Sequence, residues 1–157
     1  MRLVIGYGNP LRADDGLGWQ AALQLAEEIA SDEVQVIAAH QLTPELAEPV
    51  SRASLVMFVD AREGPEPGRV RCDTLAPAGE AGLSFSHDVD PPAILALARW
   101  LYGSQPPALM ISVDGDDFGY GAELSPVVQA ALPTVLRTVT TLLRDEMSLA
   151  HEGVLHA

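Results

Sequence analysis

The chain has 157 residues, of which 48% are hydrophobic, and it carries a formal net charge of −13 at pH 7. This composition predicts one compact globular domain and argues against intrinsic disorder. Nucleic acids and anionic membranes are poor partners for so acidic a chain, because both are bound through basic patches. A cation, or a protein with a basic face, is electrostatically easier to bind.

Two further features bear on location and covalent chemistry. No uninterrupted apolar run approaches the roughly 20 residues that span a bilayer, and the first apolar run breaks at Gly6. We therefore expect no membrane helix, no signal peptide and a cytoplasmic location. The single cysteine, Cys72, excludes an internal disulfide and a zinc site built from cysteines.

The first thirty residues predict a strand, a glycine-rich turn and a helix. Residues 3–7 are apolar, and apolar side chains spaced by four follow over 17–30. The turn between them contains Asp14 and Asp15, just where a phosphate would need free N–H groups and the positive end of the helix dipole. The turn is therefore expected to attract a cation. Asp14 is the expected helix cap, whereas nothing structural requires Asp15.

The rest of the chain alternates between strands and helices. We expect strands over 34–39, 55–59, 69–75 and 108–113, and helices that begin near residues 44, 93 and 126. Thr43 and Asp90 are the expected N-caps of two of these helices. Pro133 should kink the last helix or split it in two.

This alternation predicts a three-layer α/β/α fold with a central, mostly parallel, twisted sheet of about five strands. Residues 69–75 alternate between apolar and polar side chains, as is typical of an edge strand. The domain is expected to span residues 1–149, with a flexible tail over 150–157. In such a sheet, ligands bind outside the carboxyl ends of the strands, where the strand order reverses.

Asp15, Asp60 and His87 are the candidate functional residues. Asp60 follows an apolar strand, where a carboxylate is unfavourable unless it is hydrogen-bonded, paired or metal-bound. His87 by itself is typical of an ordinary loop histidine. Two carboxylates and an imidazole together suit a borderline divalent ion such as nickel, zinc or cobalt. The set has too many oxygens for a structural zinc site and too few for calcium.

Other polar residues have simpler interpretations. The acidic segment Asp114 to Asp117 could bind a hard ion, but it lacks the rest of an EF-hand loop and is better interpreted as a solvated turn. His40 is typical of a hydrogen-bonded loop residue, and Cys72 of a small packing residue. The serine-nucleophile motif G-x-S-x-G is absent, as is the D-[ST]-G motif of aspartic proteases.

The chain resembles the hydrogenase maturation proteases, the endopeptidases that trim the large subunit of [NiFe] hydrogenases. The resemblance rests on five segments in order: residues 8–18 (GNPLRADDGLG), 41–47 (QLTPELA), 59–61 (VDA), 86–88 (SHD) and 120–126 (YGAELSP). It covers residues 1–143. It implies that Asp15, Asp60 and His87 are both the metal ligands and the catalytic residues.

The resemblance further implies an endopeptidase, often classed as aspartic-type, that cleaves the C-terminal peptide of the nickel-loaded large-subunit precursor. The nickel would be supplied by this substrate, and zinc or cadmium could replace it in crystals. Hydrolysis could use a metal-activated water or a carboxylate as general base, and the sequence leaves both routes open. The precursor would be the partner, with no nucleic acid and no membrane, and the protease is expected to be a monomer.

Two alternatives remain open at this point. The same three residues could serve a non-catalytic nickel-binding chaperone, which would bind the precursor without shortening it. A Rossmann-type nucleotide-binding domain is the other alternative, since Gly6 and Gly8 follow a strand. In that motif, however, Leu11 occupies the place of the third glycine, and His40 that of the ribose-binding acid.

Overall fold

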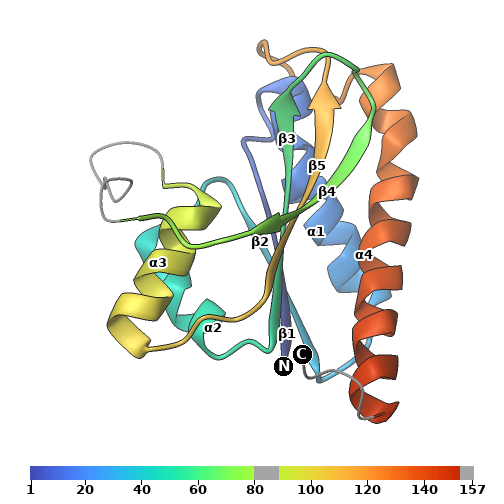
Figure 1. Ribbon diagram of the computed structural model, residues 1–157. Coiled ribbons are helices and arrows are strands. Elements are labelled where there is room, and N and C mark those ends of the chain that lie inside the picture. The colour runs from blue at the N-terminus through green and yellow to red at the C-terminus, as the bar shows by residue number, and fades with distance from the viewer. Residues whose placement is uncertain (80–88, 153–157) are drawn as a thin grey trace.

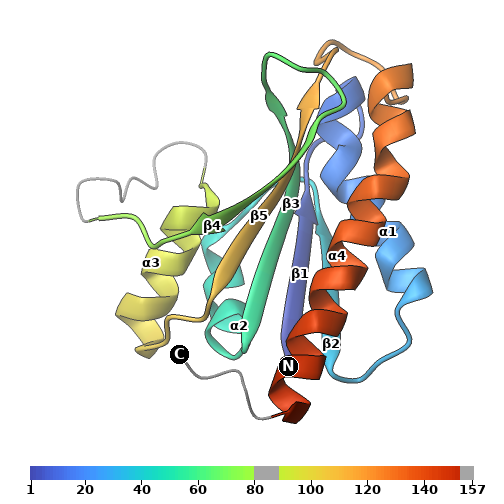
Figure 2. The same ribbon diagram turned by 45° about the vertical axis from the view of Figure 1, so that its right-hand side comes forward.

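A computed structural model describes residues 1–79 and 89–152, with side chains up to residue 145. The predicted α/β class is confirmed, since helices cover both faces of one mostly parallel sheet (Figures 1 and 2). The strands are β1 (Arg2–Tyr7), β2 (Val34–Ala39), β3 (Leu55–Glu63), β4 (Val70–Leu75) and β5 (Ala108–Gly115). The helices are α1 (Leu17–Glu28), α2 (Ala47–Ser51), α3 (Pro91–Tyr102) and α4 (Pro126–Glu152), with short 3-10 turns at Ala13–Gly16 and Pro44–Leu46.

The strand order of the sheet is β2-β1-β3-β5-β4. β4 is antiparallel to β5 and forms one edge, as predicted, and it leaves Cys72 exposed rather than packed. The chain leaves β1 for β2 on one side and then returns to β3 on the other side of β1. The strand order therefore reverses between the carboxyl ends of β1 and β3, and this is where the fold favours a ligand site.

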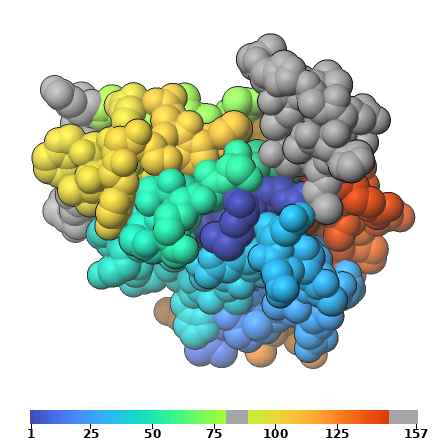
Figure 3. Space-filling view, turned by 90° about the horizontal axis from the view of Figure 1, so that it is seen from below, coloured from blue at the N-terminus to red at the C-terminus, as the bar shows by residue number. Residues whose placement is uncertain are grey.

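The hydrophobic core lies on both faces of the sheet. α1 and α4 cover one face, above side chains such as Val4, Met57 and Val59. α2 and α3 pack against each other over the other face, as the end-on view in Figure 3 shows, and cover Ile5 and Phe58. Because side chains alternate along a strand, the residues two positions further on, Tyr7 and Asp60, extend the α2–α3 face to the edge of the sheet.

The strand β3 does not end at Val59, just before Asp60, as the sequence suggested, but continues to Glu63. Its pairing with β1 stops at Val59, opposite Gly6, whereas its pairing with β5 continues from Asp60 opposite Ser112 to Glu63. Asp60 is thus the first residue of β3 that β1 no longer flanks, and β5 still holds its backbone in place.

Helix α4 is a single helix. Of the two predicted effects of Pro133, a kink or a split, the split is therefore wrong. Pro133 is exposed, and water can therefore bind the carbonyl oxygen that a missing N–H leaves free. The segment Pro126–Asp145 is long and apolar enough to cross a membrane by length and composition alone. In this fold its apolar stripe packs into the core, through Val128, Leu132, Val135, Val139 and Leu143. The helix passes the expected boundary at residue 149 and reaches Glu152.

The two predicted helix caps have different outcomes. Asp90 caps α3 as expected, because its Oδ1 accepts a hydrogen bond of 3.0 Å from the backbone N–H of Ala93. Thr43 makes no capping hydrogen bond. Its side chain instead hydrogen-bonds the carboxylate of Glu45, in the 3-10 turn that precedes α2.

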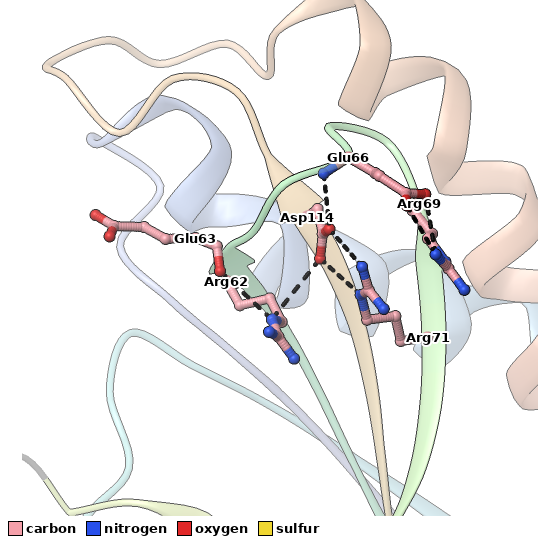
Figure 4. Close-up of polar contacts among 6 residues, drawn as sticks. All are labelled: Arg62, Glu63, Glu66, Arg69, Arg71 and Asp114. Carbon is pink, nitrogen blue, oxygen red and sulfur yellow. Dashed lines mark hydrogen bonds and ion pairs between the residues drawn. The ribbon is translucent and has the colours of Figure 1, made fainter.

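Asp114 is not part of a solvated turn, contrary to the sequence interpretation. It is fully buried, and Arg71 donates two hydrogen bonds to its carboxylate, at 3.0 and 2.9 Å (Figure 4). The backbone N–H of Glu66 adds a third at 3.1 Å, and Arg62 lies 3.7 Å away. The hydrogen bonds from Arg71 hold the pKa of Asp114 at about 2, against the opposing effect of burial. This network fastens the β3–β4 connection to β5.

We expect the variant Arg71→Gln to unfold at a higher pH than the wild type during acid titration. The native pKa of Asp114 lies below the unfolded value of about 3.9, so its ionised form stabilises the fold above about pH 4. That stabilisation is lost as the pH falls towards about 2. In Arg71→Gln the pKa of Asp114 is lowered less, so the ionised carboxylate stabilises the fold less. Circular dichroism during the titration measures the midpoint. Arg69→Gln is the matched control, since among the described residues the ion pair of Arg69 is with exposed Glu66 at 3.0 Å. Equal midpoints for both variants would contradict the assignment.

Candidate functional site

A pocket of about 870 Å³ opens at the point where the strand order reverses. The loop after β1, the turn after β2, the outer part of β3 and the start of α3 supply its lining. Its polar and charged lining includes Tyr7, Arg12, Asp15, His40, Asp60 and Asp90. The structure therefore brings Asp15 and Asp60, which are 45 positions apart in the chain, to one cavity.

Asp15 lies in the 3-10 turn that follows β1 and is partly buried. Its Oδ2 accepts a hydrogen bond of 2.8 Å from the backbone N–H of Asn9, which fixes the carboxylate across the turn. Within the described part of the chain, this is the one hydrogen bond that the carboxylate accepts. Asp15 therefore retains unused acceptor capacity beside the pocket, as a metal ligand requires.

Asp60 lines the same pocket from the outer part of β3 and is also partly buried. Its Oδ1 accepts a hydrogen bond of 2.8 Å from the backbone N–H of Ala61, and the Tyr7 hydroxyl donates a further one. Burial, helped by the nearby charge of Asp15, raises the pKa of Asp60 to about 8 despite these hydrogen bonds. Without a cation, Asp60 is therefore mostly protonated at neutral pH.

Tyr7 is a pocket residue that the sequence interpretation treated only as part of a strand. Burial raises the pKa of its phenol, and the negative charge of Asp60 raises it further, so the hydroxyl remains a donor to Asp60. The alternation of side chains along β1 was the available signal, since Tyr7 follows Leu3 and Ile5 on the α2–α3 face.

Gly8 allows the backbone to pass close to both Asp15 and Asp60. Its φ of +145° is a conformation that residues with side chains rarely adopt. A Cβ at this position would overlap the backbone carbonyl of Asp15 and would lie 3.5 Å from Oδ1 of Asp60. The close approach of the Asp15 turn to β3 therefore depends on the missing side chain.

His87, the third predicted ligand, lies outside the described residues. The described chain resumes two residues later, and there Val89 and Asp90 line the pocket. Among the residues with described positions, no group of three histidine, cysteine, aspartate or glutamate side chains could hold a metal ion. Of the three predicted ligands, the described residues place Asp15 and Asp60 at this pocket, and the metal site itself, with His87 in it, stays a prediction.

His40 and Arg12 also reach the pocket. The ring of His40 packs edge-on against Trp19, with 5.7 Å between the ring centroids, and within residues 1–79 and 89–152 it makes no hydrogen bond of the kind expected from the sequence. Arg12 lines the same cavity and donates a hydrogen bond of 3.1 Å to the backbone carbonyl of Phe118. Neither residue was predicted from the sequence to belong to the site.

Asp14 does not cap α1, so that prediction was wrong. The residue at the N-cap position is Gly16, and Asp14 is fully buried. Its carboxylate accepts four hydrogen bonds of 2.7–2.8 Å: from the backbone N–H groups of Asp116, Asp117 and Ser125, and from the Ser125 hydroxyl. Burial alone would raise the pKa of Asp14, but these hydrogen bonds outweigh it and lower the pKa.

The two neighbouring acids thus point to different places. Successive residues of a 3-10 turn project about 120° apart, since the turn has about three residues per repeat. Asp14 faces the loop between β5 and α4, and Asp15 faces the pocket. One acid fixes the structure, and the other is available to a ligand.

Comparison with solved structures identifies known proteins that share this fold. No family model matches the chain, and no curated protein matches it. The hydrogenase maturating endopeptidase HybD from E. coli superposes with a TM-score of 0.74 at 23% identity, over 92% of this chain and 93% of HybD. The [NiFe] hydrogenase maturation protease HycI from Thermococcus kodakarensis gives 0.73 at 22% identity, over 91% and 92% of the two chains.

A third solved structure, the hydrogenase 2 maturation peptidase from a Thaumarchaeota archaeon, gives a TM-score of 0.67 at 24% identity, over 90% of this chain and 97% of the peptidase. All three likenesses extend over nearly the whole of both chains, so the shared feature is the complete domain rather than a common α/β core. The resemblance seen in the sequence is therefore confirmed at the level of the fold.

Proposed function

We propose that this chain, which has the fold of the hydrogenase maturation endopeptidases, is itself such a protease. It would cleave the C-terminal peptide from the nickel-loaded large-subunit precursor of a [NiFe] hydrogenase. The observation that carries the proposal is the pocket between β1 and β3, which receives Asp15 and Asp60 from two separate segments. A phosphate ligand, as in a nucleotide-binding domain, would be repelled by the carboxylates of Asp15 and Asp90.

The nickel of the precursor is the proposed ligand of this pocket. Burial is the main cause of the raised pKa of Asp60, and repulsion by the nearby charge of Asp15 adds to it. A divalent cation favours the ionised form of both acids and would replace the proton on Asp60. His87 would complete a set of two oxygens and one nitrogen that suits nickel.

This chemistry would make the presence of nickel a condition for cleavage. The nickel would hold the segment that carries the scissile bond against Asp15 and Asp60. A water molecule would then add to the scissile carbonyl carbon, and its proton would pass to the leaving amine nitrogen. A precursor without nickel lacks the cation that the acids need, so it would neither bind well nor be cut.

Incubation of the protein with nickel-loaded and nickel-free precursor tests the proposal, with mass spectrometry of the large subunit as the measurement. We expect one cut near the C-terminus of the loaded precursor and none in the unloaded one. Asp15→Asn and His87→Ala should abolish this cut, because each removes a ligand. His40→Ala is the matched control, since His40 lines the same pocket and is not a proposed ligand.

Two outcomes would contradict the proposal in different ways. A stable complex with an uncut, nickel-loaded precursor would indicate a chaperone rather than a protease. Wild-type cleavage by both Asp15→Asn and His87→Ala would leave the protease intact and remove the ligand assignment.

A further inference from the structure

The loop before α1, at residues 11–13, and the loop before α4, at residues 120–121, are joined by backbone hydrogen bonds. Together they form one platform beside the pocket. The backbone N–H of Ala13 donates to the carbonyl of Gly121 at 2.8 Å, and the N–H of Gly121 donates to the carbonyl of Leu11 at 3.0 Å. These bonds pair Arg12 with Gly121 in a short parallel bridge. The buried carboxylate of Asp14, in the loop before α1, also holds the loop before α4, because it accepts hydrogen bonds from the backbone N–H groups of Asp116 and Ser125.

Two large apolar side chains project from this platform into solvent. Because Arg12 pairs with Gly121 in parallel, the preceding residues of the two loops, Leu11 and Tyr120, lie next to each other. Leu11 is 66% exposed and Tyr120 is 97% exposed. An aromatic side chain on a rigid backbone loses little conformational freedom when it binds, and such residues are frequent anchors in protein interfaces.

The platform is continuous with the pocket and has an acidic border. Asn9 and Arg12, on either side of Leu11 in the chain, both line the pocket. Three exposed carboxylates belong to the same loop as Tyr120, namely Asp116, Asp117 and Glu123. The surface therefore combines an apolar centre with a mainly negative rim, in which three carboxylates outnumber the one exposed guanidinium, that of Arg12. It lies next to the cavity in which the scissile segment would lie.

We propose that Leu11 and Tyr120 dock the folded body of the precursor, in an apolar depression bordered by lysine or arginine side chains. This inference rests on the proposed function, because it concerns the partner of the same site. A second copy of this chain is a poor occupant, since it would bring a like acidic rim and a net charge of −13 against the first. A basic-rimmed protein surface matches both the apolar centre and the charge.

Steady-state cleavage of the nickel-loaded precursor tests the docking surface. Tyr120→Ala should raise KM about tenfold, and Leu11→Ala several-fold, while kcat changes by less than about twofold. Tyr120→Phe should behave as the wild type. Trp100→Ala is the matched control, because Trp100 is 74% exposed on α3, outside the platform, and its loss should leave KM unchanged. Glu123→Gln should weaken the rise of KM with salt concentration.

An unchanged KM for Tyr120→Ala, or an equal rise for Trp100→Ala, would overturn the docking surface and leave the proposed protease intact. If the wild type binds the precursor without cutting it, the dissociation constants of the variants for the precursor test the docking surface instead of KM. A Tyr120-dependent affinity would then support the docking surface although the protease proposal fails. If the wild type neither cuts nor binds the precursor, both proposals fall.

Discussion

Replacing Asp14 by alanine should lower the free energy of unfolding at pH 7 by about 3–5 kcal/mol. The substitution removes a buried carboxylate that accepts four hydrogen bonds, and it leaves three backbone N–H groups and the Ser125 hydroxyl without that partner. Urea unfolding of the wild type and the variant measures the difference. Asp15→Ala is the matched control, since Asp15 accepts one hydrogen bond among the described residues, and its effect should stay within about 1 kcal/mol.

Asp14→Asn should also be strongly destabilising, although the sequence alone suggested a mild loss of a helix cap. An asparagine amide can present only one oxygen, so its NH2 group would face donors that the carboxylate satisfies now. Because the native pKa of Asp14 is lowered, its stabilisation is present above about pH 4 and fades in acid. A variant as stable as Asp15→Ala would contradict the assigned role of Asp14.

Replacing Asp60 by asparagine should abolish precursor cleavage, by about 10³-fold or more, and yet stabilise the protein without metal by about 3 kcal/mol at pH 9. The asparagine side chain would keep the oxygen that accepts the Ala61 N–H, so the fold loses no backbone partner. It would lack the negative charge that burial and Asp15 disfavour. Thermal unfolding and the cleavage assay, run on the same preparation, measure the two opposite effects.

The pH dependence of the free energy of unfolding shows whether Asp60→Asn stabilises the protein by removing a buried charge or by some other effect. In the wild type, the folded state holds the Asp60 proton up to about pH 8, whereas the unfolded state releases it near pH 4. The folded state therefore binds more protons between these values, and stability falls as the pH rises through that window. Asp60→Asn should lack this fall. Equal slopes in the two proteins, without metal, would show that Asp60 is ionised in the native state.

The sequence was sufficient for the class of the fold and for the place of the pocket. Apolar runs and helical spacing predicted the alternation of strands and helices, and the rule for open sheets then led to the ends of β1 and β3. It also predicted that Asp15 and Asp60 would meet, although they lie on separate elements. The prediction for His87 is not tested, because His87 lies outside the described residues.

The errors share one physical cause, which is that local patterns do not contain long-range partners. Asp14 was interpreted as a cap because a cap is the nearest use for an acid before a helix, whereas its partners lie 102–111 positions away. Asp114 was interpreted as solvated, and its partner Arg71 lies 43 positions away on β4. The length of β3 depended in the same way on its register with β5.

The division of labour between the adjacent acids limits how this turn can be reused in protein design. A designer who transfers residues 8–16 to another parallel sheet would carry over Asp15 but would leave Asp14 facing a foreign surface with none of its four donors. The graft would then fold poorly, or would reorient the turn and misdirect Asp15. The transplantable unit is therefore discontinuous, and it must include residues 116–125 as well.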